Sequence, residues 1–488
     1  SKASGIGTKI ALRTGSRWTL TNTFKQSSSA GQSLQPVIIG IGNKSSADFV
    51  ALEWSDGVYQ TELNLQPGIH HITETQRQLA SCPVLFVWNG EKFEYVSDIL
   101  GVAGIGFAIG PGQYAEPRPW ENFMLPNNLL KSKDGVYELL LTEPMEEVMY
   151  LDNARLEVYD LPPGWHLALD ERMGINAPFP TGEAFVYQDF ISPLKATNGE
   201  HQDVTNSILL RDNIAAPIPE ADKRFLGLTK EAHQLTVTFS EPINETNNPH
   251  LLIDGWVEYP YSQTSFSAWQ AGEVYKPASL EVRTPDGQWH MLYKDFGYPA
   301  GMPRQMSLPL FNLPNGVDAI RLSARMEIFW DRIGLVYGQS LEQQSSTADS
   351  AIKREAPLLA ASAEDFGFAK RSTLAQKRPH YDCEQSQPIW DTRYPTGYYS
   401  QLGDVTELVK EHDSALAIIG PGEGIRLQFA ATQAPLKAGW QRVYVLSSKG
   451  WVKDMDMYTE DTSTVGPLPG EETKARSKLH SKYNTRFE

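Results

Sequence analysis

Residues 84–96 have the sequence Val84-Leu85-Phe86-Val87-Trp88-Asn89-Gly90-Glu91-Lys92-Phe93-Glu94-Tyr95-Val96, which predicts a β-hairpin. The first five residues form an apolar run of the length of a buried strand. Asn89-Gly90 is the strongest short hairpin signal, because both residues of this turn need a positive φ that Asn and Gly tolerate. Phe93, Tyr95 and Val96 then supply the returning strand.

Similar short strands and turns occur along the rest of the chain. Asp286-Gly287 is a second hairpin turn, between strands expected at 280–283 and 289–292. Further strand patterns lie at 8–13, 37–41, 49–54, 58–63, 69–73, 137–142, 155–159, 234–239, 320–324, 415–419, 425–429 and 442–446. The 38 Gly, 32 Pro, 20 Tyr, 19 Phe and 12 Trp also favour strands and turns over long helices. We therefore expect a mainly β protein of several antiparallel β-sandwich or jelly-roll-like modules with few short helices.

The chain of 488 residues is too long for one compact core, and composition divides it into six segments. We expect a β module at 1–78, a hairpin and glycine-rich connection at 79–133, and a β-sandwich region at 134–340. A polar linker or crossing segment follows at 341–389, then a C-terminal β-rich module at 390–466 and a polar tail at 467–488.

The formal net charge of −16 argues against nucleic acid and anionic membrane surfaces as partners, because like charges repel. No apolar run reaches the about 20 residues that span a bilayer, so we expect no transmembrane segment. The opening residues do not form a signal peptide, and we expect the chain to be a piece of a longer protein.

Cys82 and Cys383 are the two cysteines of the chain. They are too few for a disulfide framework, but in an oxidising compartment they could form one long-range bridge. Two buried thiols are the alternative, and the sequence leaves both interpretations open.

Four stretches of the N-terminal segment form one pattern with a known family. They are Gly5-Ile6-Gly7-Thr8-Lys9-Ile10, Ile39-Gly40-Ile41-Gly42, Val50-Ala51-Leu52-Glu53-Trp54-Ser55-Asp56-Gly57-Val58-Tyr59-Gln60-Thr61 and His71-Ile72-Thr73-Glu74. The segment carrying them resembles the ASPIC/UnbV module, over about 75 residues. It departs from the family pattern between Trp18 and Ser33, where Phe24-Lys25-Gln26-Ser27-Ser28-Ser29 replaces the usual loop.

The resemblance implies a setting rather than a reaction. In such proteins the module follows an FG-GAP or VCBS β-propeller, often calcium-binding, in bacterial surface proteins and animal extracellular-matrix proteins. We therefore expect an extracellular, cell-surface or periplasmic protein with a propeller upstream of this chain, in an extended bacterial form. Residues 279–289 and 320–335 also resemble galactose-binding-type jelly rolls. The family provides no catalytic residues to transfer.

Aromatic residues crowd residues 255–270 and 329–332 and suggest a ligand site. The candidates are Trp256, Tyr259, Tyr261, Trp269, Trp330, Asp331 and Arg332. Exposed Trp and Tyr rings beside polar groups suit a sugar, whose C–H faces stack while its hydroxyls need hydrogen-bond partners. The alternative is that these rings fill a large sandwich core.

Asp454, Asp456, Glu460 and Asp461 form an acidic cluster whose oxygens could bind Ca²⁺. The cluster does not fit an EF-hand loop, because Thr459 stands where Gly is needed and Val465 where a bidentate Glu belongs. A solvated acidic loop without metal is the alternative, and Ca²⁺ is the one cofactor that the sequence suggests.

No enzyme motif is present in the sequence. There is no H-E-x-x-H or G-x-S-x-G, and the glycine-rich stretch 104–110 lacks the spacing and the following helix of a dinucleotide loop. Carboxylates for glycoside hydrolysis must converge in space, which a sequence does not show. Asp254, Glu258, Glu327 and Asp331 are candidates only because they neighbour aromatic residues.

One pentapeptide pattern occurs twice, as His201-Gln202-Asp203-Val204-Thr205 and as Leu402-Gly403-Asp404-Val405-Thr406. In each copy Asp and Thr can satisfy the free N–H groups of a helical turn. We interpret the repeat as capping in two related sandwich modules rather than as two active sites.

Three functions remain open at the level of sequence. The first is a non-enzymatic binding or scaffolding protein, adhesive in character, that recognises a glycan or a protein partner. The second is an enzyme or accessory protein of secondary-metabolite biosynthesis, the context that gives the UnbV half of the family its name. The third is a structural subunit of a surface assembly.

Overall fold

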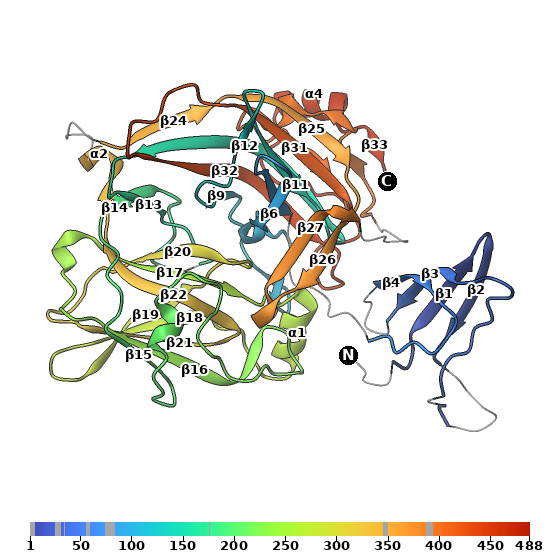
Figure 1. Ribbon diagram of the computed structural model, residues 1–488, viewed down its shortest axis with the longest axis horizontal. Coiled ribbons are helices and arrows are strands. Elements are labelled where there is room, and N and C mark those ends of the chain that lie inside the picture. Colours follow the sequence, from blue (N-terminus) through green and yellow to red (C-terminus); the bar gives the residue numbers. More distant parts are fainter. Residues whose placement is uncertain are drawn as a thin grey trace. The chain divides into compact units, whose positions relative to one another are not determined.

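A computed structural model describes residues 5–24, 31–33, 35–54, 59–73, 83–174, 176–344, 350–386 and 394–488 (Figure 1). The chain divides into two compact units. The first contains residues 1–78 with 386–393, and the second contains residues 79–385 with 394–488.

The first unit contains one antiparallel sheet with the strand order β2-β1-β3-β4. The strands are β1 (Lys9–Thr14), β2 (Arg17–Asn22), β3 (Ala47–Glu53) and β4 (Tyr59–Leu65). Leu12, Val50 and Leu52 point from one face of the sheet into a small core, and Ile39 and Ile41 pack against them. The expected strands at 37–41 and 69–73 are irregular in the structure. Their apolar side chains therefore cover the sheet without joining it.

The second unit contains the other strands and all four α-helices of the described residues. Its first strands are β5 (Val84–Trp88), β6 (Phe93–Asp98), β7 (Ala108–Gly110), β8 (Gln113–Tyr114), β9 (Trp120–Met124), β10 (Ser132–Lys133), β11 (Val136–Thr142), β12 (Glu147–Leu161), β13 (His166–Leu169), β14 (Ala184–Tyr187), β15 (Lys195–Asn198), β16 (Leu228–Thr238), β17 (Pro249–Val257), β18 (Ala278–Arg283), β19 (Trp289–Gly297), β20 (Arg304–Pro309), β21 (Ala319–Met326), β22 (Ile328–Tyr337) and β23 (Gln339–Ser340).

The remaining elements complete the second unit. They are β24 (Ile352–Ala356), β25 (Leu358–Asp365), β26 (Ala369–Thr373), β27 (Pro379–Ser386), β28 (Tyr398–Tyr399), β29 (Gly403–Asp404), β30 (Ala417–Ile419), β31 (Glu423–Ala430), β32 (Gln441–Asp454) and β33 (Arg486–Phe487). The α-helices are α1 (Ser262–Gln270), α2 (Leu341–Gln344), α3 (Thr406–Val409) and α4 (Lys474–Tyr483), and short 3₁₀ turns are η1 (Gly101–Ala103), η2 (Thr205–Ile208), η3 (Glu245–Asn247) and η4 (Ala375–Lys377).

One sandwich of the second unit, the split module, is formed by residues 84–161 together with residues 352–454. Its larger sheet has the order β29-β25-β31-β11-β5-β6, with β10 also paired to β11, and its other sheet has the order β24-β12-β32-β9, with β30 also paired to β12. Buried side chains of both sheets, such as Leu139, Leu156 and Phe429, form one apolar core.

The other sandwich, the middle module, is formed by residues 195–337. Its sheets have the orders β15-β16-β21-β18-β19 and β20-β17-β22. They enclose a separate core that includes Val237, Ile253, Leu280 and Ile333. In the view of Figure 1 the split module occupies the upper half of the second unit and the middle module the lower half. The mainly β, antiparallel class predicted from the sequence is confirmed.

The segment boundaries differ from those expected. Residues 341–389 were expected to be a polar crossing segment, but they contain α2 and the strands β24–β27. Strand β25 alternates buried alanines, Ala361 and Ala363, with Ser362 and Glu364. Alanine is a weak hydrophobic signal, so a core-facing strand looked polar in the sequence.

Two further segments also differ from what composition indicated: one contains regular secondary structure, and strands of the other share a sandwich with distant parts of the chain. The polar tail at 467–488 contains α4 and β33, and β33 pairs with β28. Strands of the expected connection 79–133, namely β5, β6 and β9, belong to the same sandwich as β31 and β32. These pairings join segments hundreds of residues apart, which local composition does not reveal.

None of the helices in the described part of the chain has the length and apolar character needed to cross a membrane.

Shortening a side chain at the centre of the split module should lower its stability. Leu139 is fully buried in β11, between β31 and β5. Leu139→Ala should reduce the free energy of unfolding by about 2–5 kcal/mol, because the truncation leaves a cavity. The matched control Leu359→Ala, at a side chain that is 53% exposed in β25, should change it by less than about 0.5 kcal/mol. Equal effects of both variants in urea unfolding would contradict the assignment of this core.

Candidate functional site

Three aromatic rings form an exposed cluster on the second unit. Phe266 of α1 lies 4.4 Å from Tyr458 between ring centroids, with the planes inclined by 15°, and 5.7 Å from Trp269. Trp269 is 48% exposed, while Phe266 and Tyr458 are half-buried. We call these three residues the aromatic surface. It combines α1 of the middle module with the loop that follows β32 of the split module.

The acidic loop at 454–461 holds α1 in place. Gln263 donates its backbone N–H to the Asp456 carboxylate at 2.9 Å, and the Ser262 and Thr459 hydroxyls are 3.2 Å apart. A carboxylate at the first turn satisfies a free N–H and complements the helix dipole. Asp456 is therefore a positioning residue for the helix that carries Trp269.

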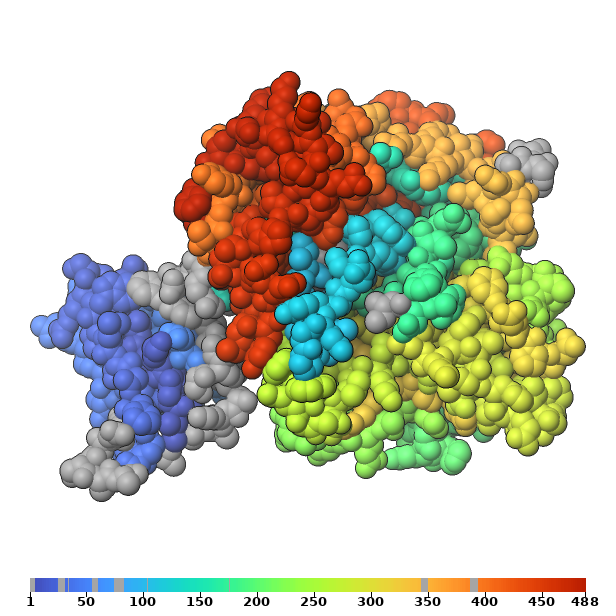
Figure 2. Space-filling view, turned by 180° about the vertical axis from the view of Figure 1, so that it is seen from behind, coloured from blue at the N-terminus to red at the C-terminus, as the bar shows by residue number. Residues whose placement is uncertain are grey.

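The glycine-rich stretch meets the same two elements. Gly106 adopts a φ of +67°, and a Cβ there would lie 2.9 Å from the Glu460 backbone nitrogen. Glu460 donates its backbone N–H to the Gly106 carbonyl at 3.0 Å, and Ala108 donates to the Ser262 hydroxyl at 3.1 Å. Figure 2 shows the C-terminal segment (red), the segment near residue 110 (light blue) and the α1 region (light green) meeting on one face. The aromatic residues, the acidic cluster and the glycine-rich stretch are separate features of the sequence, and in the fold they lie together.

The acidic residues have separate roles in the loop. Asp454 accepts the backbone N–H of Asp456 at 3.0 Å, and Asp456 accepts that of Tyr458 at 2.9 Å. Within the described ranges, no group of three or more His, Cys, Asp or Glu side chains is arranged to hold a metal ion. The structure therefore does not bring Asp454, Asp456, Glu460 and Asp461 together as a ligand set, and Ca²⁺ binding stays a prediction.

A lysine supplies a positive charge to this loop. Lys453 is buried, and its ammonium donates to the carbonyls of Gly466 at 2.8 Å and Thr464 at 3.1 Å. Burial lowers the pKa of Lys453, whereas Asp461 and Glu460 raise it. The ammonium closes the loop by binding carbonyl oxygens, as a bound cation does.

Most of the other aromatic candidates lie inside the protein. Trp256 stacks on Phe329 with ring centroids 5.4 Å apart, and its indole N–H donates to the Gln376 carbonyl at 2.9 Å. Tyr259, Tyr261 and Trp330 are also buried. For Trp256, Tyr259, Tyr261 and Trp330 the structure shows the core arrangement and not an exposed stacking platform. Trp269 is the candidate ring that faces solvent.

The polar candidates Asp331 and Arg332 belong to an internal network. Asp331 is buried and accepts the backbone N–H groups of Asn213 and Ile214 at 3.1 and 3.2 Å. Burial raises the pKa of Asp331, and the Asn213 N–H opposes this shift. Arg332 donates to the Asp254 carboxylate at 2.7 Å. These contacts hold the loop at Asn213 and Ile214 against β22. They also engage the carboxylates of Asp331 and Asp254, which a ligand would need as hydrogen-bond partners.

The remaining carboxylate candidates, Glu258 and Glu327, converge on one lysine. The Lys377 ammonium lies 2.8 Å from Glu327 and 3.7 Å from Glu258. Burial raises the pKa of Glu258 to about 8, against the lowering effect of Lys377. A raised pKa beside a second carboxylate is typical of a general acid. However, the two side chains are only 2% and 3% exposed, so a substrate does not reach them.

Lys377 belongs to the tip of the β26–β27 ribbon, which docks on the middle module. The Gln376 amide donates to the Ala215 carbonyl at 3.0 Å and accepts the Ala215 N–H at 2.9 Å. Gln376 also binds the Trp256 indole through its carbonyl. The Lys377 pair is therefore part of an anchor that closes over the buried Trp256.

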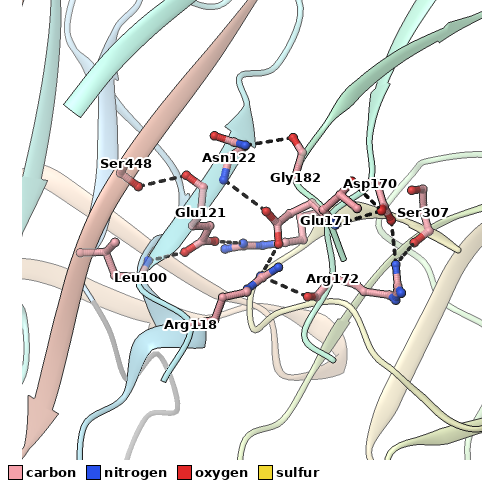
Figure 3. A network of polar contacts seen from close by, with 12 residues as sticks. Leu100, Arg118, Glu121, Asn122, Asp170, Glu171, Arg172, Gly182, Ser307 and Ser448 are labelled. Atoms are coloured by element: carbon pink, nitrogen blue, oxygen red, sulfur yellow. Dashed lines mark hydrogen bonds and ion pairs between the residues drawn. The ribbon is translucent and has the colours of Figure 1, made fainter. Parts of the chain in front are cut away.

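A buried ion cluster joins the two modules (Figure 3). Arg304 of β20 binds both Asp98 at the end of β6 and Glu121 of β9. Glu121 also accepts the backbone N–H of Leu100, and Ser448 donates its hydroxyl to the Glu121 carbonyl at 3.2 Å. One guanidinium from the middle module thus neutralises two carboxylates of the split module.

The cluster continues through Glu171, which follows β13. Glu171 binds Arg118 and accepts the backbone N–H of Asn122 at 3.2 Å. Arg172 donates to Asp170 at 2.8 Å and to the Ser307 carbonyl at 3.0 Å. Figure 3 shows Glu121 and Glu171 pointing into the same cluster from different segments. The charged groups are paired, as burial requires.

A pocket with an empty volume of about 410 Å³, its open mouth included, adjoins this cluster. It is lined by Asn122, Phe123, Met124, Leu169, Glu171, Arg211, Arg304 and Gln305. Two of its three charged lining residues, Glu171 and Arg304, belong to the cluster that joins the modules, and the third, Arg211, pairs with Asp254. We assign Glu171 and Arg304 to that structural role.

Cys383 is a free thiol in the structure, and its Sγ donates to the Phe93 carbonyl at 3.2 Å. Cys82 lies outside the described residues. The bridge between Cys82 and Cys383 therefore stays a prediction.

Sequence reasoning missed Tyr458 and Arg304. The sequence gives no sign of a role for Tyr458, because its partner Phe266 is almost 200 positions away. Arg304 stands in a segment without any motif. A useful signal would have been a single charged residue in a strand with no other charge, since such a charge needs partners when the strand is buried.

Removing the shared guanidinium should destabilise the second unit. Arg304→Met leaves Asp98 and Glu121 buried without their cation and should cost about 3–5 kcal/mol of unfolding free energy. The triple variant Arg304→Met, Asp98→Asn, Glu121→Gln should recover a large part of this loss, because the uncompensated charges are gone. Denaturant titration measures both values, and a triple variant no more stable than Arg304→Met would contradict the pairing.

The stability of the second unit should fall between pH 5 and pH 8 through Glu171. Burial raises the pKa of Glu171 to about 7, while Arg118 lowers it. The folded protein thus keeps a proton that the unfolded chain releases above its ordinary pKa of about 4.3, so rising pH favours unfolding until the pH passes the folded-state pKa. Glu171→Gln should remove about 1–3 kcal/mol of this pH-dependent loss. Urea unfolding at pH 5 and pH 8 measures the effect, and an unchanged pH slope would contradict it.

Comparisons with known proteins are informative for the first unit. No curated protein matches the chain. A solved structure described as that of infectious bursal disease virus Gx strain aligns with 83% of this chain and 84% of its own at 9% identity, but with a TM-score of 0.11 it carries no argument. Residues 1–78 match the family model described as ASPIC and UnbV, which confirms the resemblance found in the sequence. The N-terminal part of the chain, residues 1–78, is therefore a domain of the ASPIC and UnbV family.

Proposed function

We propose that the chain is a non-enzymatic binding protein that recognises a glycan at the aromatic surface formed by Phe266, Trp269 and Tyr458. The observation that carries this proposal is the 48% exposure of Trp269 beside the half-buried Phe266–Tyr458 stack. An exposed ring of this kind provides the apolar face on which the C–H groups of a pyranose pack.

Polar groups for the sugar hydroxyls lie on the same helix face. Gln263 precedes Phe266 by three residues and Gln270 follows it by four, so both residues stand on the same face of α1 as Phe266. Amide groups can both donate to and accept from hydroxyls. The combination of stacked rings and amides is what a site for a neutral sugar needs.

The rigidity of the surface supports the same function. Trp269 stands on a helix rather than a loop, and Asp456 and Ser262 fix the first turn of that helix. A preorganised ring loses little conformational freedom on binding, which favours affinity. The buried carboxylate pair Glu258 and Glu327 is closed to substrate, so the binding function does not depend on it.

The compartment that we propose rests on the family match of the first unit and on the net negative charge. The ASPIC and UnbV match at residues 1–78 supports the proposed extracellular, cell-surface or periplasmic location, and a β-propeller upstream of this chain is part of the same proposal. The net charge of −16 disfavours nucleic acid as the partner and is compatible with a neutral glycan.

Trp269→Ala should weaken glycan binding about tenfold or more, because one stacked ring contributes on the order of 1–2 kcal/mol. A glycan array on the whole chain identifies a ligand, and calorimetry then compares the variants. The matched control is Trp18→Ala, at a tryptophan that is 37% exposed in β2 of the first unit and should leave affinity unchanged. The proposal is wrong if the array shows no ligand, or if both variants bind like the unmodified protein.

A further inference from the structure

The larger sheets of the two modules have the same strand arrangement. The split module has the order β25-β31-β11-β5-β6, and the middle module has the order β15-β16-β21-β18-β19. Each sheet ends in a hairpin, with Asn89-Gly90 between β5 and β6 and Asp286-Gly287 between β18 and β19. The two orders place the hairpins at the same end.

The facing sheets correspond in the same way. The split module has β9-β32-β12, and the middle module has β20-β17-β22. Strand β32 therefore corresponds to β17, β12 to β22, and β9 to β20. Across both sheets eight strands of one module match eight strands of the other, with antiparallel pairing throughout.

A β-bulge at equivalent positions supports this correspondence. The pairing of β12 with β32 shifts between Leu151 and Asn153, and that of β22 with β17 shifts across Asp331. The extra residue is an aspartate in both modules, Asp152 and Asp331, and both are buried. The position of a bulge is a specific property of a fold. That the two bulges agree in both position and residue type therefore supports the correspondence between the modules.

The residue opposite each bulge is a glycine for the same steric reason. A Cβ on Gly450 would lie 2.6 Å from the Tyr150 carbonyl oxygen, and one on Gly255 would lie 2.3 Å from the Phe329 carbonyl oxygen. Tyr150 and Phe329 each stand two residues before the bulge aspartate. Both modules therefore need glycine at the corresponding position of the central strand.

The repeated Asp-Val-Thr pattern makes the same hydrogen bonds in both copies. Thr205 binds Asp203 through its N–H at 2.9 Å and its hydroxyl at 2.6 Å, and Thr406 binds Asp404 with the same two distances. The Thr205 hydroxyl accepts the Ala196 N–H of β15 at 2.9 Å, and the Thr406 hydroxyl accepts the Ala361 N–H of β25 at 2.9 Å. In each copy Asp therefore accepts the N–H of the first residue of the helical turn, whereas Thr binds the neighbouring strand rather than a further N–H group of the turn.

The correspondence continues in the loop that follows each turn, where the residue numbers of equivalent positions always differ by the same amount. Asp212 accepts the N–H of Ile214, and Asp413 accepts that of Ala415. Between them Asn213 and Ser414 both adopt a φ of +63°. These loops then meet the bulge aspartates.

Each loop is tied to the bulge of its own module. Asn213 and Ile214 donate to Asp331. In the split module, His412, which directly precedes Asp413 in the loop, lies 3.8 Å from the Asp152 carboxylate, and the Lys449 ammonium lies 3.0 Å from it. The paired features thus link the loop, the bulge and the strand end in both modules.

We infer that the second unit consists of two copies of one jelly-roll sandwich, one of them circularly permuted and split by the insertion of the other. In the middle module the chain runs β15, η2, β16, β17, β18, β19, β20, β21, β22. In the split module the equivalents of β18 to β22 come first in the chain, as β5, β6, β9, β11 and β12. The equivalents of β15, η2, β16 and β17 follow the insertion, as β25, α3, β31 and β32.

The ends of the interruption lie where an insertion can be accommodated. Asp160 near the end of β12 pairs directly with Ile352 at the start of β24. Residues 162–351 therefore leave and re-enter the split module at neighbouring positions on adjacent strands. The insertion opens what would otherwise be an ordinary β-hairpin connection.

An exchange of the two loops tests the inference in the whole chain. In the in-register variant, residues 404–415 replace residues 203–214 while Arg211 is retained for its contact with Asp254. We expect a cooperative fold with a Tm lowered by less than about 5 °C, since the hydrogen-bonding residues fall in equivalent places. The matched control inserts residues 405–416 instead, which removes Thr from the capping position, and should lower the Tm by at least twice as much.

The inference is overturned if the in-register exchange destabilises as much as the shifted control, or if neither variant folds. Two milder variants give an independent measurement. Asp331→Asn should speed amide exchange at Asn213 and Ile214, and Asp152→Asn should speed it at Ser414, each at least about tenfold at its own loop. Failure of either variant to affect its loop would also contradict the equivalence.

Discussion

The second unit depends on the contact that Arg304 makes with Asp98 and Glu121. Each sandwich has its own apolar core, and a smaller cluster in which Met302 packs with Phe86 and Leu140 spans both modules. A guanidinium buried between two carboxylates has a fixed geometry, and a shift that withdraws it from either carboxylate inside the protein would leave a buried charge without its partner. This contact and the docking of the β26–β27 ribbon through Gln376 therefore fix how the modules meet. The aromatic surface depends on it, since α1 and Tyr458 come from different modules.

The sequence predicted the class of fold because turns and alternation are local properties. Asn89-Gly90 and Asp286-Gly287 lie at the hairpins that they predicted. The module boundaries were not predictable in this way. Strand β11 pairs with β31, almost 300 residues later, and no local pattern records that pairing. The alanines of β25 also concealed a core-facing strand, because their small side chains give little hydrophobic contrast.

The candidate site was predicted in its parts but not in its arrangement. The aromatic, acidic and glycine-rich segments were each recognised, and the structure brings them together around α1. Their individual roles differ from expectation for physical reasons. Trp256 and Trp330 are large apolar groups with one polar atom, and burying them against the strands removes more apolar area from water than exposure would. Tyr458 became visible only as the partner on which Phe266 stacks.

The split of one sandwich around another has a consequence for synthesis on the ribosome. Strands β5 to β12 emerge first, but their partners β31 and β32 emerge only after the whole intervening sandwich has been made. Val84, Leu85 and Leu140, which are fully buried in the finished protein, are therefore exposed during that interval. Apolar strands with open edges invite wrong pairing. The middle module, whose strands are contiguous in sequence, can fold during the same interval. Its Arg304 is then in place to bind Asp98 and Glu121 of the half of the split module that has already been made.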